Sequence, residues 1–400
     1  MTQGPGEVVV TGVGLALPGA DTPDALLRGT ACPVTGPAAE PFDTAARIGR
    51  RGHRYKDRAT RLALCAALDA LRSARLIPSD GEEVMVPGDT VGVVASSNLG
   101  NLDTACLTAA AIAERSAVDL SPMSLPNASS NVIASWVAIR HGLRGPNLML
   151  CNGATSGLDA VHWGAALVAA GRVRRAVVIG VETHNAVVED LLGRPAAELL
   201  DGAAAIVVEG AHWAEARGAR AAATLGPYER RAGLSGCVEA LLPGGAAPGV
   251  WFTPERYAEG PAGARAGAEG PAGAVPVPQS VPRYDVTSAV GRASGALGVL
   301  QCAAAIGWLA RAEAGTDAET GAGPQAAGPD AGPETGAGSG IAAGPGAAPG
   351  PVPVPASRQA LITSGDDTAD AVAGLLLRPT PDRCHPHPPR APLSAMECSR

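Results

Sequence analysis

The 400-residue sequence lacks the features that would suit a nucleic-acid or membrane partner. Lys56 is the only lysine, the formal net charge is -7, and no run of Lys and Arg forms a basic stripe, so phosphate-backbone binding is not expected. No apolar stretch reaches the roughly 20 residues that span a bilayer. The short polar N-terminus has no basic segment before an apolar run, as a signal peptide would. We therefore expect a cytoplasmic protein.

Aromatic residues and paired cysteines are also scarce. Aromatics make up 3% of the chain against 46% hydrophobic residues, so Ala, Val and Leu must fill the core. None of the eight cysteines forms a C-x-x-C pair, and zinc sites need paired ligands. Their apolar surroundings favour reduced, buried thiols. His385 and His387 are only weak support for a metal site, so no metal and no cofactor are expected. The cysteines stand at positions 32, 65, 106, 151, 237, 302, 384 and 398.

What is present is an alternation of strands and helices over the first 210 residues. The clearest helix spans 155–170, where Leu158, Val161 and Val168 share one face and Gly171 follows. Such alternation predicts an α/β layered fold whose sheets are covered on both sides. Further helices are predicted at 57–75, 102–116 and 128–142, and strands at 7–14, 90–96, 147–152, 175–181 and 203–209.

The second half of the chain differs in composition, being rich in Gly, Ala and Pro. We divide the chain into a first half at 1–240, a degenerate second half at 241–378, and a disordered tail at 379–400. Low-complexity insertions are expected at about 255–282 and 313–357, because such segments bury too little side-chain surface to offset their ordering entropy. A compact segment at 284–312 and a strand pair within 358–377 remain.

Gly12 and Gly14 follow a predicted strand, as in a dinucleotide-binding loop. The G-x-G-x-x-G spacing fails, because Leu17 occupies the third glycine position. A tight turn after the strand is the better interpretation.

Residues 145–160, G-P-N-L-M-L-C-N-G-A-T-S-G-L-D-A, carry the strongest motif. A strand, a turn of small residues and a helix would present one residue at a helix N-terminus, where the dipole and backbone N–H groups stabilise an anion. This segment resembles the nucleophile elbow of the β-ketoacyl synthases, T-A-C-S-S-G-L-D-A. The family cysteine falls on Ala154, followed by Thr155, Ser156 and Gly157.

The resemblance covers roughly residues 7–210 and weakens beyond them. It is carried by the segments 8–14, 56–63, 122–145 and 201–209. In the second half, 287–298 resembles the family's K-S-x-x-G-H-x-x-G-A-x-G, with Thr287 at the lysine position and Arg292 at the histidine position. The family's H-G-T-G-T has no counterpart, and 363–368 replaces its closing F-G-F-G-G.

These resemblances imply a thiolase-like, layered αβαβα fold of two pseudo-repeated halves. They imply an acyltransferase family member that is inactive alone, because the methyl group of Ala154 cannot attack a thioester. We therefore assign no catalytic residue and treat Ala154, Thr155, Ser156 and Gly157 as a vestigial elbow. Cys151 is interpreted as a buried side chain of the preceding strand.

The function that the resemblance implies is that of a chain length factor in polyketide or fatty-acid-type biosynthesis. Its partners would be an active ketosynthase, as a heterodimer, or a second copy, as a homodimer, together with an acyl carrier protein. Residues 122–131 are expected at the subunit interface. Two alternatives stay open: an acyltransferase or malonyl-ACP decarboxylase that uses a residue other than cysteine, and a decayed paralogue without function.

Overall fold

The computed structural model describes residues 6–27, 40–122, 125–255, 275–320, 357–365 and 370–380. Ten strands form one hydrogen-bonded sheet in the order β3-β2-β4-β5-β1-β6-β10-β9-β7-β8. The strands are β1 Val8–Ala16, β2 Val91–Ser96, β3 Asn147–Leu150, β4 Arg175–Glu182, β5 Gly202–Gly210, β6 Ala223–Arg231, β7 Val250–Phe252, β8 Arg283–Tyr284, β9 Ala360–Ser364 and β10 Val372–Arg378.

The sheet consists of two five-stranded halves with the same internal pairing. In the first, β5 pairs antiparallel with β1 and β4, and β2 is parallel to β4 and β3. In the second, β10 pairs antiparallel with β6 and β9, and β7 is parallel to β9 and β8. The predicted pair of repeated halves is thus confirmed, and the short β7 and β8 make the second half the reduced one.

A short antiparallel seam joins the halves, where Val9 pairs with Thr224 and Val10 with Ala223. The repeat begins at β6, so we propose that the division predicted after residue 240 lies before Ala223.

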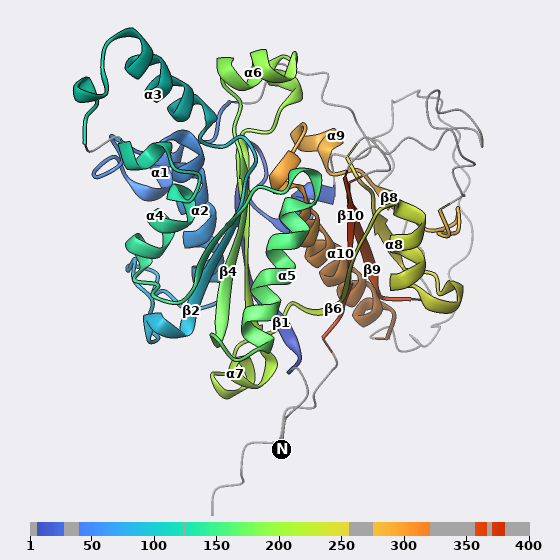
Figure 1. Ribbon diagram of the computed structural model, residues 1–400. Helices are drawn as coiled ribbons and strands as arrows, with labels where there is room; N and C mark the ends of the chain where they lie inside the picture. The colour runs from blue at the N-terminus through green and yellow to red at the C-terminus, as the bar shows by residue number, and fades with distance from the viewer. Residues whose placement is uncertain are drawn as a thin grey trace, which may run out of the picture.

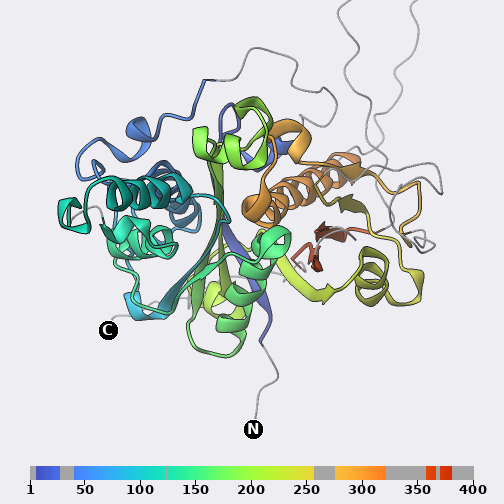
Figure 2. The same ribbon diagram turned by 45° about the horizontal axis from the view of Figure 1, so that its top comes forward.

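Helices cover the sheet in layers (Figure 1). In the first half, α2 and α4 enclose one apolar core against one face of the sheet. On the other face, α5 of the first half and α10 of the second half form the central layer. α8 covers the outer face of the second half. Figure 2 shows α10 as a long central helix beside the second half-sheet. The bounds are α1 Thr44–Ile48, α2 Arg58–Ser73, α3 Leu102–Glu114, α4 Val132–His141, α5 Ser156–Ala169, α6 Ala186–Leu192, α7 Ala211–Ala216, α8 Leu234–Leu241, α9 Thr287–Val290 and α10 Leu297–Thr320.

Gly12 and Gly14 do not form the predicted turn. Both lie within β1, which continues to Ala16. A Cβ on Gly12 would stand 2.3 Å from the carbonyl oxygen of Ala70, and one on Gly14 2.2 Å from that of Ala66. The glycines therefore let α2 approach β1 backbone to backbone.

Two predictions for the second half need correction. Val277 and Val281, placed in the first insertion, are buried beside α8. α10 continues to Thr320, past the predicted start of the second insertion at 313. β9 and β10 confirm the predicted strand pair. Residues 256–274, 321–356 and 381–400, where we predicted the rest of the insertions and most of the tail, lie outside the described residues.

The segment from Ser294 to Glu313 is apolar and long enough to span a bilayer by length and composition, contrary to the sequence expectation. However, 83% of its apolar window is buried inside the protein, between the two half-sheets. This segment is therefore a core helix of the layered fold.

Candidate functional site

The elbow lies where β3 meets the central layer. A 3-10 turn at Gly153–Thr155 follows the strand, and α5 starts at Ser156. Gly153 supplies the left-handed conformation, with φ of 77°, that the turn needs. Ala154 is exposed at the tip of this turn. The sequence motif thus forms the predicted strand–turn–helix geometry, with a methyl group at its exposed position.

Neither hydroxyl of the elbow is free to act as a nucleophile. The Ser156 side chain is fully buried, and its Oγ accepts from the Asn152 N–H at 2.6 Å. The same hydroxyl faces the Gly153 carbonyl at 2.8 Å and the Asn98 Oδ1 at 3.0 Å. The buried Thr155 hydroxyl donates to the Asp159 carboxylate at 2.8 Å.

Asp159 gathers further donors behind the elbow. Its carboxylate accepts from Asn152 Nδ2 at 2.9 Å and from the Tyr228 hydroxyl of β6, while Arg230 Nε lies 3.7 Å away. Burial and the adjacent Asp159 carboxylate raise the pKa of Tyr228. The His162 ring stacks on Tyr228 with centroids 4.2 Å apart. This cluster ties α5 to the second half.

Cys151 is exposed, so its interpretation as a buried strand residue is wrong. β3 ends at Leu150, one residue before it. Partial burial, followed by the nearby Glu182 carboxylate, raises the pKa of this thiol, which disfavours the thiolate. Cys106 on α3 is exposed as well, whereas Cys65, Cys237 and Cys302 are buried as expected.

Two residues that the sequence analysis missed hold the elbow in place. The Asn98 side chain donates to the Gly153 carbonyl at 2.8 Å and faces the Gly153 N–H at 3.3 Å. The same Nδ2 group reaches Ser294 Oγ, in the second half, at 2.8 Å. Glu182 lies at the end of β4 and accepts from the N–H groups of Asn98 at 2.7 Å and Leu99 at 3.1 Å. Asn98 and Glu182 each follow a predicted strand. That position after a strand was the only sequence signal that could have identified them as site residues.

Glu182 is fully buried and connects the two halves. Its carboxylate also accepts from Ser97 Oγ at 3.0 Å and from the Gly295 N–H, at the start of α10, at 3.0 Å. Burial raises the pKa of Glu182 to about 7, and the hydrogen bonds to the carboxylate oppose that rise. Whether the Glu182 side chain carries a proton therefore depends on the pH near neutrality.

The second half contributes an ion pair to the site. Arg292 Nε donates to the Glu255 carboxylate, whose second oxygen accepts from the N–H groups of Ala293 at 3.3 Å and Ser294 at 3.2 Å. Ser294 has a positive φ of 39°, which is uncommon for a residue with a Cβ. The Thr287 hydroxyl bonds to Asp285. Arg292 thus lies next to residues that contact the elbow. Among the described residues, Thr287 makes no hydrogen bond to the elbow.

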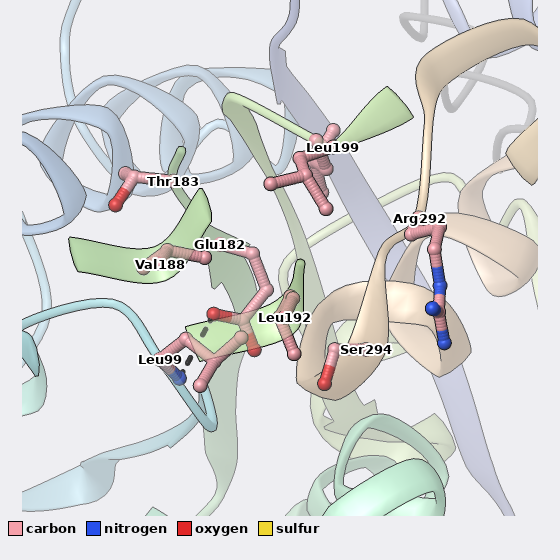
Figure 3. A pocket seen from close by; sticks show the side chains of 9 residues that line it. Leu99, Glu182, Thr183, Val188, Leu192, Leu199, Arg292 and Ser294 are labelled. Atoms are coloured by element: carbon pink, nitrogen blue, oxygen red, sulfur yellow. Dashed lines mark hydrogen bonds between the residues drawn. The ribbon is translucent and has the colours of Figure 1, made fainter. Parts of the chain in front are cut away.

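A cavity of about 60 Å³ lies between these residues of the second half and the residues around Glu182 in the first half (Figure 3). Leucine and valine side chains form much of its wall, and Glu182, Thr183, Arg292 and Ser294 are its polar side chains. None of its nine lining residues is a histidine or a cysteine. The lining is Leu99, Glu182, Thr183, Val188, Leu192, Leu199, Leu200, Arg292 and Ser294.

Three of the described histidines are held by structural contacts. His141 is fully buried, and burial lowers its pKa to about 4 while Nδ1 contacts the Glu82 carbonyl. His53 contacts Arg140, and His212 lies against Trp213. Within the described ranges, no group of three or more His, Cys, Asp or Glu side chains could hold a metal ion.

Comparison with protein families agrees with this geometry. Residues 30–189 match the family model described as the β-ketoacyl synthase N-terminal domain, which includes the elbow. Over these residues the chain is similar to the β-ketoacyl synthases. It is 27% identical over 192 residues to 3-oxoacyl-[acyl-carrier-protein] synthase 2 of Vibrio harveyi, covering 44% of itself and 45% of that relative. It is 26% identical over 141 residues to the Vibrio cholerae protein of the same name, covering 35% of itself and 33% of that relative. The chain thus aligns with less than half the length of these relatives.

Solved structures confirm the thiolase-like fold of the chain along most of its length. The ishigamide ketosynthase/chain length factor aligns with a TM-score of 0.65 at 22% identity, covering 94% of this chain and 99% of that one. One chain of a solved complex described as a type II PKS acyl-carrier protein with its ketosynthase aligns with a TM-score of 0.64 at 14% identity, covering 94% of this chain and 100% of that one. A β-ketoacyl synthase from Burkholderia phymatum has the same TM-score, identity and coverage.

Proposed function

We propose that the chain is a non-catalytic, chain-length-factor-like subunit that pairs with an active β-ketoacyl-ACP synthase in polyketide or fatty-acid-type biosynthesis. The observation that carries this proposal is the methyl group of Ala154 at the exposed tip of the elbow. Covalent acyl transfer needs a nucleophile and a base that activates it. Ser156 and Thr155 are buried and engaged by amide, carbonyl and carboxylate oxygens.

The proposed partner subunit fits the exposed edge of the first half-sheet. Among the described strands, β3 is the last on that side and pairs only with β2. The helices beside it expose large apolar side chains, Ile139 of α4 at 68% and Trp163 of α5 at 50%. Helix α3 has no buried residue and exposes Leu107 at 69%. An unpaired strand edge flanked by apolar side chains suits a stable protein–protein contact.

An acyl carrier protein is the second proposed partner, as in the complex of the structurally similar ketosynthase. Arg50, Arg51 and Arg54 lie exposed before α2, with no carboxylate within 4 Å among the described residues. Lys56 stands 3.8 Å from the Trp136 ring centroid, beside them in the chain. This cluster offers an anionic partner a positive surface on a chain of net charge -7.

An activity assay tests the proposal directly. The purified chain is mixed with malonyl-carrier protein, alone and with an active ketosynthase from the same genome. We expect no acetyl-carrier product from the chain alone and stable co-purification with the ketosynthase. Turnover by the chain alone that Ser156→Ala abolishes would establish the acyltransferase or decarboxylase alternative. A folded chain that binds neither partner would support the decayed-paralogue alternative.

A further inference from the structure

The two central helices present their N-termini to each other at the site. α5 and α10 cross so closely that a Cβ on Gly157 would stand 2.5 Å from the Gly298 nitrogen. Helix N-termini carry partial positive charge and favour anions. Two internal carboxylates already lie at this junction, since Glu182 accepts from the Gly295 N–H and Glu255 from the Ser294 N–H.

Glu255 contacts the backbone N–H groups before α10 much as Asn98 contacts the elbow before α5. Asn98 follows β2 and lies against the Gly153 N–H at the start of the elbow. Glu255 follows β7, the equivalent strand of the second half, and accepts from two N–H groups that lead into α10. Where the first half places a neutral amide, the second half places a carboxylate, which also binds Arg292.

From this arrangement we propose that Glu255 determines specificity by excluding anionic groups, such as a malonyl carboxylate, from the elbow, so that the site admits neutral acyl chains. The inference rests on the proposed function and names the ligand class of the same site. Glu255 engages the backbone donors and Arg292, leaving those groups paired. Its side chain is 15% exposed, so its charge is only partly screened by solvent.

A thiol introduced at the elbow measures this effect. Ala154→Cys is made together with Cys151→Ser, because residues 151 and 154 fall on one tryptic peptide. The thiolate then displaces iodide from iodoacetate, an anion, or iodoacetamide, a neutral analogue, and forms one S–C bond in either case. The ratio of the two rates reports the electrostatic potential at the elbow rather than its accessibility.

Adding Glu255→Gln should raise the iodoacetate-to-iodoacetamide ratio roughly threefold to tenfold, as expected for loss of one nearby charge at an effective dielectric of about 20 or more. The matched control is Glu239→Gln, at an exposed position of α8, which should leave the ratio unchanged. An unchanged ratio in the Glu255 variant, or an equal rise in both variants, would overturn the proposal. Circular dichroism and melting temperature check that each variant is folded. A negative result would leave the proposed lack of catalysis standing, because malonyl-carrier turnover tests that separately.

Discussion

At the scale of single residues, Glu182 is a buried group of the site whose raised pKa lies near neutrality. It is fully buried, its pKa is raised to about 7, and its four hydrogen-bond donors come from both halves of the chain. Because the folded-state pKa lies above the unfolded value, the folded state binds the proton more tightly. The resulting stability is complete below about pH 4.5 and is lost as the pH rises through 7.

Glu182→Gln should therefore flatten the dependence of stability on pH between 5 and 8. The wild-type chain should lose up to about 3 kcal/mol of unfolding free energy over this range relative to the variant. Urea denaturation at several pH values measures the difference, with the exposed Glu239→Gln as control. Parallel stability curves for the wild type and the Glu182 variant would contradict the prediction.

At the scale of elements, the crossing of α5 and α10 depends on two glycines. A Cβ on Gly298 would lie 2.3 Å from the Leu158 nitrogen, and backbone atoms cannot yield as a flexible side chain can. Gly298→Ala should destabilise the fold by about 1–3 kcal/mol or more, despite the better helix propensity of alanine. Ala303→Gly in the same helix serves as a control for helix propensity. Thermal melting curves of both variants measure the change in stability. A stabilised Gly298→Ala variant would refute the close approach.

The edge of the first half-sheet gives a second prediction at this scale. Ile139→Glu combined with Trp163→Glu should abolish association with the partner subunit, because charges would replace apolar side chains beside β3. The conservative pair Ile139→Val and Trp163→Phe should retain it. Light scattering after size-exclusion chromatography measures both. Unchanged association of the glutamate variant would place the interface elsewhere.

Helices were predicted well from the sequence where a hydrophobic periodicity is followed by a glycine that ends the helix. Gly142 and Gly171 have φ of 68° after α4 and α5, as the helix-stop interpretation required. Gly14 misled the prediction, because a glycine that admits a neighbouring helix has the same local signature as one in a turn. β6, β7 and α8 went unassigned, since short segments among Gly and Pro lack a clear period.

The site was predictable only in part. The sequence motif of the elbow identified Ala154 and its neighbours, because the strand, the small residues and the helix are contiguous in sequence. Asn98, Glu182 and Glu255 meet the elbow only through tertiary contacts between distant strands. The pairing of Arg292 with Glu255, 37 residues away, has no sequence signature.

At the scale of the whole molecule, a buried ionic cluster at the far ends of β4 and β5 holds the first half together. The fully buried Glu209 carboxylate bonds to Arg175 at 2.8 Å, to Arg217 at 2.7 Å and to the Thr11 hydroxyl at 3.3 Å. Burial lowers the pKa of Arg175, an effect that Glu209 opposes.

Glu209→Ala should destabilise the chain by about 3–5 kcal/mol, because it leaves the buried Arg175 without its anionic partner. The double variant Glu209→Ala, Arg175→Met should recover part of that loss, since it removes the uncompensated charge. Chemical denaturation of both variants measures the recovery. Equal destabilisation of the single and double variants would show that packing, rather than charge, dominates at this position.

The seam between the half-sheets has a mechanical consequence. In the part of the chain that the structure describes, only the pairs Val9–Thr224 and Val10–Ala223 join the strand ladders of the two half-sheets. A force that slides the halves past each other would therefore meet little resistance from the ladder. Its main load would fall on the interlocked central helices and on the Asn98 and Glu182 hydrogen bonds, so shear would reach the elbow before it reached either outer layer.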